Sequence, residues 1–273
     1  MKTEGVAELG MLGLGLAFLL ALAPLWVFHD MRLPLGKQLL GALARMVLQL
    51  SALGLVLEVL FRVNHSLLTV GWLLVMQGAA AHTILSRTGL KLPGLPLMLL
   101  AVLCAGGGTV LAYCLAVVVR PHPLLYARYA IPLGGMILGN SMNGITLALE
   151  KQSARLLGAE GRREWDLLLG LGASVDEARR RFSSGALRLA LLPTLNTTAT
   201  IGLVSIPGMM TGQILGGSPP ATAIGYQMMI MLAILASVSL SAWLALRLLH
   251  WRLVDREGLF RGEAGLPETP SVN

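Results

Sequence analysis

The 273-residue chain is too apolar and too poor in charge to be an ordinary water-soluble protein. Hydrophobic residues make up 55% of it, charged residues only 13%, and its mean hydropathy is +0.72. An average soluble domain carries about 25% charged residues, so most of this exterior must face lipid. The formal charge of +7 does not indicate nucleic-acid binding, because the basic residues lie in short gaps between apolar runs.

Seven apolar segments are long enough to cross a bilayer, which takes a helix of about 20 residues. The sequence therefore predicts an all-α, polytopic bundle of transmembrane helices with about seven spans, at 9–28, 39–61, 67–86, 95–119, 129–149, 187–206 and 222–246. The leader before the first span carries Glu4 and Glu8, whereas a cleaved signal needs a basic leader, so we interpret this segment as a retained span.

The positions of Lys and Arg predict the orientation of the spans. Sixteen of these 21 residues lie in one set of alternate connections, four lie in the other set, and Arg45 lies inside a span. Because cytoplasmic connections are enriched in positive charge, we expect the N-terminus outside and the C-terminus in the cytoplasm. One transmembrane domain is predicted over 1–254, and the polar, glycine- and proline-containing segment 255–273 is predicted to be a short disordered cytoplasmic tail.

The second predicted span contains three polar side chains. Such residues usually face the interior of a bundle or a water-filled cavity, so Arg45, Gln49 and Glu58 are candidates to line a transport pathway. For two of them a simpler explanation exists. Glu58 lies four residues before Arg62 and can form an ion pair with it, and Arg45 lies close enough to Lys37 to extend to the cytoplasmic interface. Gln49 is the better candidate for a cavity.

The fifth predicted span has an unusual composition, with one Pro, four Gly and two Asn in the fourteen residues 131–144. Proline and glycine disfavour a regular helix, so we expect helix breaks at Pro132, Gly134 and Gly139. One interpretation is a kinked helix that packs against its neighbours. The other is a discontinuous helix that presents backbone carbonyls, Asn140 and Asn143 to a pathway.

The sixth span is expected to end at a break formed by Pro207 and Gly208, near the outer face. Met209 and Met210 follow directly, and thioethers suit soft metal ions, although Met is also a common packing residue. The seventh span opens with two further pathway candidates, Tyr226 and Gln227.

No catalytic or firm metal site is predicted. The five histidines are scattered, and Cys104 and Cys114 lie about 15 Å apart along a helix, too far for a disulfide. The chain contains no GxxxxGK[ST] phosphate-binding loop and no hydrolase or metalloprotease motif. We therefore expect a transporter subunit that has no ATPase site of its own and is not an enzyme.

The longest connection, 150–188, is not featureless. Its residues 162–169 predict a short amphipathic helix, and a glycine break follows. Ser174 and Glu177 then have the spacing of a capping box, which predicts a second helix from Val175. This element is either a docking surface for a cytoplasmic motor protein or a charged loop that anchors two spans through lipid phosphates.

Residues 129–246 resemble FetB-type permeases, a family of bacterial ABC transporter membrane subunits linked to iron export, with plant relatives linked to aluminium tolerance. The resemblance extends over nearly the whole chain. It is carried by 131–143, 171–178 and 186–217, by Tyr226 and Gln227, and by Arg45 and Gln49 in the second span.

The resemblance implies a permease subunit in the bacterial inner membrane that exports a metal ion such as iron. ATP and Mg²⁺ would bind a separate cytoplasmic ATPase subunit, two permease copies would form the pathway, and this chain would hold no cofactor. The residues that resemble the coupling loop of ABC permeases are Leu171, Gly172, Ala173, Ser174, Glu177 and Ala178. An ABC importer permease and an ATP-independent carrier or channel are the alternatives.

Overall fold

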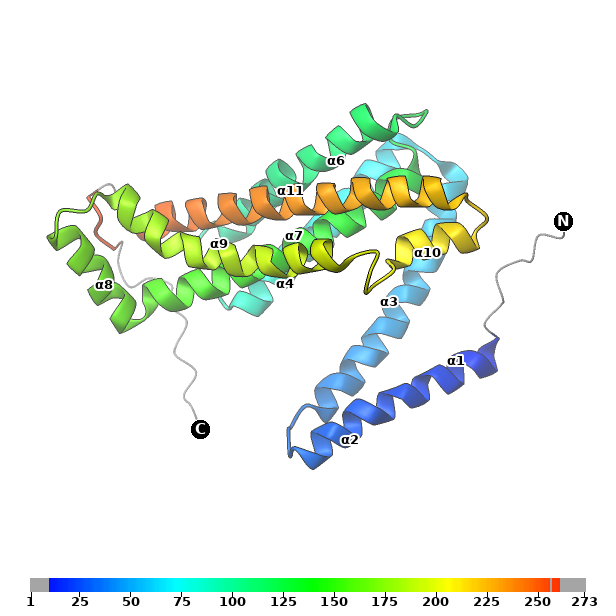
Figure 1. Ribbon diagram of the computed structural model, residues 1–273, viewed down its shortest axis with the longest axis horizontal. Helices are drawn as coiled ribbons and strands as arrows, with labels where there is room; N and C mark the ends of the chain where they lie inside the picture. The colour runs from blue at the N-terminus through cyan, green and yellow to red at the C-terminus, as the bar shows by residue number, and fades with distance from the viewer. Residues whose placement is uncertain (1–9, 256, 261–273) are drawn as a thin grey trace.

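Helices account for all the long elements of the computed structural model, which describes residues 10–255 and 257–260 (Figure 1). Within these residues the only β-type pairs are two isolated bridges, Ile201 with Ser205 and Val254 with Phe260. The predicted all-α class is therefore confirmed. The helices are α1 (Met11–Phe18), α2 (Leu22–Asp30), α3 (Gly36–Val63), α4 (Ser66–Thr88), α5 (Leu95–Leu103), α6 (Thr109–Tyr113), α7 (Ala127–Leu157), α8 (Ala159–Gly170), α9 (Val175–Thr200), α10 (Gly208–Leu215) and α11 (Pro220–Leu253).

Five helical segments are long and apolar enough to cross a membrane. They are Met11–Asp30, Gly36–Val63, Ser66–Thr88, Leu95–Val119 and Pro220–Leu253, and each coincides with a predicted span. The other two predicted spans overlap α7 and the second half of α9, helices that are 31 and 26 residues long. Both helices are less apolar than the five, because α7 carries two Asn and α9 begins with a charged first turn. The number of spans and the orientation of the termini remain predictions.

The centre of the bundle is α7, which packs against α4, α9 and α11 (Figure 1). Small residues bring neighbouring elements unusually close. A Cβ atom on Gly106 would lie 2.9 Å from the backbone nitrogen of Ser241 on α11, and one on Gly144 would lie 2.6 Å from the side chain of Val238. The hydroxyl groups of Ser141 on α7 and Ser237 on α11 also hydrogen-bond to each other. Close approach of this kind is how helices associate in lipid, where the hydrophobic effect between them is weak.

The predicted breaks in the fifth span are wrong. Helix α7 runs without interruption, and Pro132 is its sixth residue, so its missing N–H weakens only the first turns of the helix. Gly134 allows close packing, since a Cβ there would lie 2.6 Å from Leu73 of α4, whereas Gly139 has no neighbour within 4 Å and simply continues the helix. The composition of this span reflects packing of α7 inside the bundle and not a discontinuity.

The sixth span ends earlier than predicted. Helix α9 stops at Thr200, and residues 201–207 form a turn in which the N–H of Gly202, at φ +85°, donates to the carbonyl of Ser205 over 2.9 Å. Pro207 is the N-cap of α10, so Pro207 and Gly208 start a new helix and do not end the previous one. The left-handed conformation of Gly202 is easily adopted only by glycine, which explains why the chain turns there.

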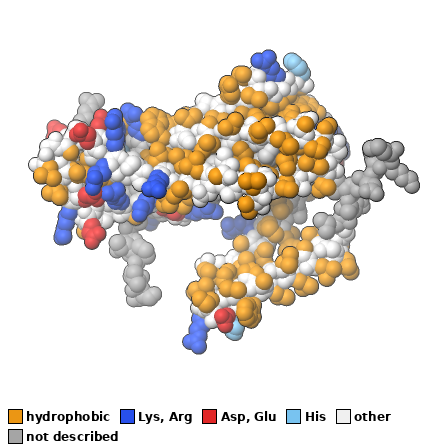
Figure 2. Space-filling view, in the orientation of Figure 1, with side chains coloured by type: hydrophobic (Ala, Val, Ile, Leu, Met, Phe, Trp, Pro, Cys, Tyr) orange, Lys and Arg blue, Asp and Glu red, His pale blue; other side chains and the backbone are white. Residues whose placement is uncertain are grey.

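Helices α1 and α2 and much of α3 project from the bundle (Figure 1). No residue of α1 or α2 is buried, and α3 buries only Leu60, in a small cluster with Ala127 and Ile131. Hydrophobic side chains cover the projecting helices and the long sides of the bundle, while Lys, Arg, Asp and Glu gather at the end that carries α8 (Figure 2). This distribution is typical of a protein whose sides face lipid.

Candidate functional site

The connection between α8 and α9, residues 171–174, forms a corner at one end of the bundle (Figure 1). The side chain of its last residue caps the start of α9. The hydroxyl of Ser174 accepts a bond from the Glu177 N–H over 3.3 Å, and the Glu177 carboxylate accepts one from the Ser174 N–H over 2.8 Å. The latter bond lowers the pKa of Glu177. Gly172, at φ +91°, makes the reversal between the helices. The predicted order of helix, glycine break and capped helix is confirmed.

Most of the predicted coupling residues are on the surface of this corner. Leu171 is 76% exposed, although it is apolar, and Gly172, Ser174 and Glu177 are exposed as well, whereas Ala173 is half-buried. Ala178 is only 1% exposed because it packs in the main hydrophobic cluster. Its side chain is therefore not part of the exposed surface, and its role in coupling stays a prediction.

Aromatic packing fixes the corner to the bundle. Trp165 of α8 is fully buried, its indole N–H donates to the carbonyl of Gly258 over 2.9 Å, and its ring lies edge-on to Phe182 and Phe260. Residues 257–260 are thus folded against α8, although the sequence predicted a disordered tail from Asp255. The rest of the predicted tail, 261–273, lies outside the described residues, as does residue 256.

A network of charges joins α7, α8 and α9 at the base of the corner. Arg155 donates to both carboxylate oxygens of Glu164 over 2.8 Å, and Arg181 donates to the same carboxylate over 3.2 Å. These bonds, the one from Arg155 above all, lower the pKa of Glu164. The Arg155 guanidinium also lies 4.3 Å from the centre of the Phe182 ring. The corner is therefore positioned by three helices and has little freedom to move independently of them.

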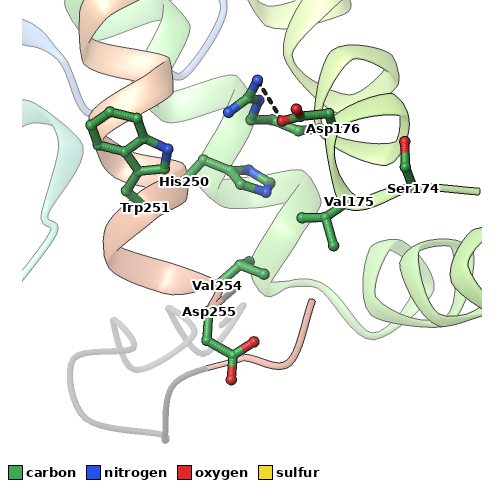
Figure 3. A pocket seen from close by; sticks show the side chains of 8 residues that line it. Ser174, Val175, Asp176, His250, Trp251, Val254 and Asp255 are labelled. Atoms are coloured by element: carbon green, nitrogen blue, oxygen red, sulfur yellow. Dashed lines mark ion pairs between the residues drawn. The ribbon is translucent and has the colours of Figure 1, made fainter. Parts of the chain in front are cut away.

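A groove of about 670 Å³ lies beside the corner, between the start of α9 and the end of α11 (Figure 3). Asp176 and Arg179 form an ion pair over 2.7 Å on one side of it, and Asp255 lies on the other. His250 is 2% exposed with its ring centre 4.9 Å from that of Trp165, and within the described part of the chain neither ring nitrogen has a hydrogen-bond partner. The exposed corner and the groove together offer a partner both a convex and a concave surface.

Two of the predicted pathway residues lie on one exposed face of α7. Asn140 donates to the carbonyl of Met136 over 2.8 Å, one turn earlier, and Asn143 accepts a bond from Arg87 of α4 over 3.3 Å. Both Asn side chains are exposed in the single chain. Sequence reasoning missed Arg87, and only its position near the end of the third span could have pointed to it.

The candidates on α3 lie apart from this face. Arg45 and Gln49 are exposed on the projecting helix, and in the described residues no hydrogen bond or ion pair joins them to Asn140 or Asn143. Glu58 pairs with Arg62 over 3.1 Å at an exposed site near the end of α3, so the simpler interpretation of Glu58 is confirmed.

Of the candidates near α10 and the start of α11, Met209 and Tyr226 pack against other side chains. Met209 and Met210 are half-buried, and Met209 packs against a hydrophobic cluster that includes Leu133 of α7 and Ile230 of α11. Tyr226 stacks on Tyr129 with ring centres 6.4 Å apart, and Gln227 is buried with no partner in the described chain for its side-chain oxygen. No group of three or more His, Cys, Asp or Glu suited to a metal ion occurs among the described residues.

The fold and this site define a multi-pass α-helical membrane protein with a rigid corner at one end. The chain belongs to the uncharacterised protein family UPF0014, whose model matches residues 11–254. It is 37% identical over 209 residues to the UPF0014 membrane protein slr1647 of Synechocystis sp. (strain ATCC 27184 / PCC 6803 / Kazusa). The matched residues make up 77% of this chain and 80% of slr1647.

Two further relatives confirm the resemblance found in the sequence. The chain is 31% identical over 232 residues to the probable iron export permease protein FetB of Escherichia coli (strain K12), covering 85% of this chain and 87% of FetB. It is 29% identical over 244 residues to the protein ALUMINUM SENSITIVE 3 of Arabidopsis thaliana, covering 85% of this chain and 83% of that protein. No solved structure matches the chain significantly.

Proposed function

We propose that this chain is the membrane permease subunit of an ABC transporter in the bacterial inner membrane that exports a metal ion such as iron. The observation that carries the proposal is the α8–α9 corner, a capped and exposed element that is fixed to α7 and α11. The name of the FetB relative, probable iron export permease protein, supports both the transport role and the cargo. A permease of such a system needs a partner, and a cytoplasmic ATPase that binds ATP and Mg²⁺ fits the corner.

The corner has the properties that coupling to a motor requires. Leu171 presents an exposed apolar side chain that a complementary groove can bury. Behind it, Trp165 and the Glu164 network connect the corner to helices that continue into the bundle, so a push on the corner moves those helices. The alternative interpretation, a charged loop that only anchors two spans through lipid phosphates, provides no such connection.

The pathway is proposed to run along the exposed face of α7, between two copies of the permease. Asn140 and Asn143 lie on this face within the predicted fifth span, where a polar side chain facing lipid is costly. A second copy covering the face would enclose these side chains in a polar passage. Arg45 and Gln49 on α3 are further candidates for the same passage.

An ATP-independent carrier is the weaker alternative. Proton-driven carriers use acidic groups inside the membrane, and Glu58, near the end of the second span, is the only acidic residue in any predicted span. Because Glu58 is engaged by Arg62 at an exposed position, it does not have the environment of a proton-transfer group.

Cellular metal content tests the proposed export directly. Cells that lack the protein are compared with cells that express it, and several metals are measured in each. We expect iron to be higher in the cells that lack the protein and to return to normal on expression of the wild-type chain. A lower iron content would indicate import, and unchanged contents of all metals would contradict metal export.

The same experiment tests the corner through a matched pair of variants. Leu171→Asp places a charge at the tip of the corner, whereas Leu167→Asp places the same charge at a 62%-exposed position on α8 away from the tip. We expect only Leu171→Asp to lose metal export and co-purification of the ATPase, with both variants reaching the membrane in normal amounts. Equal behaviour of the two variants would exclude docking at the tip.

A further inference from the structure

A second groove, of about 380 Å³, opens between α9 and α11 and gathers positive charge. Arg180, Ser183 and Ser184 line it from α9, and Trp243 and Arg247 line it from α11. Its two helices run in opposite directions, and the groove lies near the end of the bundle that carries the other charged residues (Figures 1 and 2). No residue of this groove belongs to the corner at 171–174.

Arg247 is held in place by two tryptophans of its own helix. Its guanidinium lies 5.4 Å from the ring centre of Trp243, one turn earlier, and 5.2 Å from that of Trp251, one turn later. A cation–π contact of this kind is made by the charge of the guanidinium and does not use up its N–H donors. Two parallel N–H groups of an arginine match the spacing of two phosphate oxygens. Arg247 is thus preorganised to bind an anion.

The opposite side of the groove supplies further donors. Arg180 is exposed, and in the described part of the chain neither Arg180 nor Arg247 forms an ion pair, whereas neighbouring Arg179 is neutralised by Asp176. The Ser183 hydroxyl accepts a bond from Gln152 over 3.5 Å, which leaves its own O–H free to donate. Two arginines that form no ion pair in the described chain and a serine hydroxyl therefore line one groove.

The position of the groove along α11 indicates where the anion comes from. Residues 220–246 contain no charged side chain and no histidine, so Arg247 is the first charge at the end of this span. Tryptophans favour the headgroup layer of a bilayer, and Trp243 and Trp251 are both exposed on either side of Arg247. Leu187 and Leu246 line the same groove, so it has apolar as well as polar walls.

We propose that this groove binds the phosphate group of an anionic phospholipid, with Arg247 and Arg180 as the principal ligands. Basic pockets between membrane helices are suited to anionic headgroups, and each basic side chain near such a surface contributes favourably to binding. The bound lipid would brace α9 against α11 just below the corner. The proposal depends only on membrane insertion and is independent of the transported species.

The test uses the full-length protein purified in detergent and titrated with phosphatidylglycerol, with bound lipid counted by native mass spectrometry. We expect Arg180→Gln/Arg247→Gln to bind phosphatidylglycerol roughly thirtyfold more weakly than the wild type, as expected for the loss of two basic contacts. The control, Lys151→Gln/Arg163→Gln, removes the same charge from two other exposed positions and is expected to bind like the wild type. Equal binding by the two double variants would overturn the proposal.

Two further measurements identify the ligand, and a single variant keeps the test valid if the double variant misfolds. Phosphatidylcholine, which has no net charge, is expected to bind weakly to every variant, and inorganic phosphate is expected not to compete with phosphatidylglycerol. Full competition by inorganic phosphate would show a site for soluble anions and contradict the lipid assignment. If the double variant does not fold, Arg180→Gln alone is used, because it leaves the contacts of Arg247 with Trp243 and Trp251 intact. This variant must still weaken phosphatidylglycerol binding, and unchanged binding would overturn the proposal.

Discussion

Gly161 lies where the chain passes from α7 into α8, and the structure leaves no room there for a side chain. A Cβ atom at this position would lie 1.6 Å from the carbonyl oxygen of Arg155, so even alanine must displace the backbone. We expect Gly161→Ala to lower the free energy of unfolding by about 1–3 kcal/mol, as overpacking usually does. Thermal denaturation in detergent measures this.

The matched control is Gly170→Ala, at the other end of the same helix, where a Cβ would have no neighbour within 4 Å. This variant is expected to unfold at or above the wild-type temperature, because alanine favours a helix more than glycine. A loss of stability no greater for Gly161→Ala than for Gly170→Ala would show that the α7–α8 junction is less tightly packed than described.

Glu164 makes the stability of the corner depend on pH. Hydrogen bonds from Arg155 and Arg181 hold its pKa below the ordinary value of about 4.3. The stabilisation is therefore complete above the unfolded-state pKa and is lost as the pH falls through the folded-state pKa. We expect the unfolding temperature of the wild type to fall more steeply below about pH 5 than that of Glu164→Gln, which has no carboxylate at this position to protonate.

Glu160→Gln provides the comparison, since it removes the same charge from the same helix at an exposed position that makes no ion pair within the described residues. Its pH profile should follow that of the wild type. Parallel profiles for all three proteins would mean that the Glu164 network does not contribute to stability in solution.

The corner is the element that sequence reasoning described best, because its signals are local. Ser174 and Glu177 are three residues apart, and a capping box needs no information from the rest of the chain.

We expect Ser174→Ala to destabilise the start of α9 by about 1 kcal/mol, detected as faster amide exchange over its first turn. Ser86→Ala, in the last turn of α4 where the hydroxyl only donates back to the carbonyl of Thr83, should leave exchange in α4 unchanged, and equal effects would argue against a capping role.

Elements whose geometry depends on distant contacts could not be predicted. The glycines of α7 suggested breaks, but whether a glycine interrupts a helix or admits a neighbour depends on what lies opposite, which for Gly134 is Leu73 on another helix. The folding of 257–260 against α8 depends on the bond from Trp165 to Gly258, which joins residues 93 positions apart. The burial of Ala178 was missed for the same reason, since it is decided by tertiary packing.

The whole molecule is strongly asymmetric. Charged side chains gather at the end with α8, and the long sides are apolar (Figure 2). The sequence predicted this much because hydropathy and charge distribution follow from composition alone. The way in which α1, α2 and α3 project from the bundle was not predictable, since apolar helices that face lipid carry no signal for their neighbours.

The location of the corner relative to the membrane decides whether an ATPase can reach it. The measurement is labelling by a membrane-impermeant maleimide of a chain in which Cys104 and Cys114 are replaced by alanine. Leu171→Cys reports on the corner, and Leu215→Cys, 59% exposed at the end of α10, reports on the opposite end (Figure 1). We expect intact cells to label only Leu215→Cys and opened cells to label Leu171→Cys as well. Labelling of Leu171→Cys from outside intact cells would contradict coupling to a cytoplasmic ATPase.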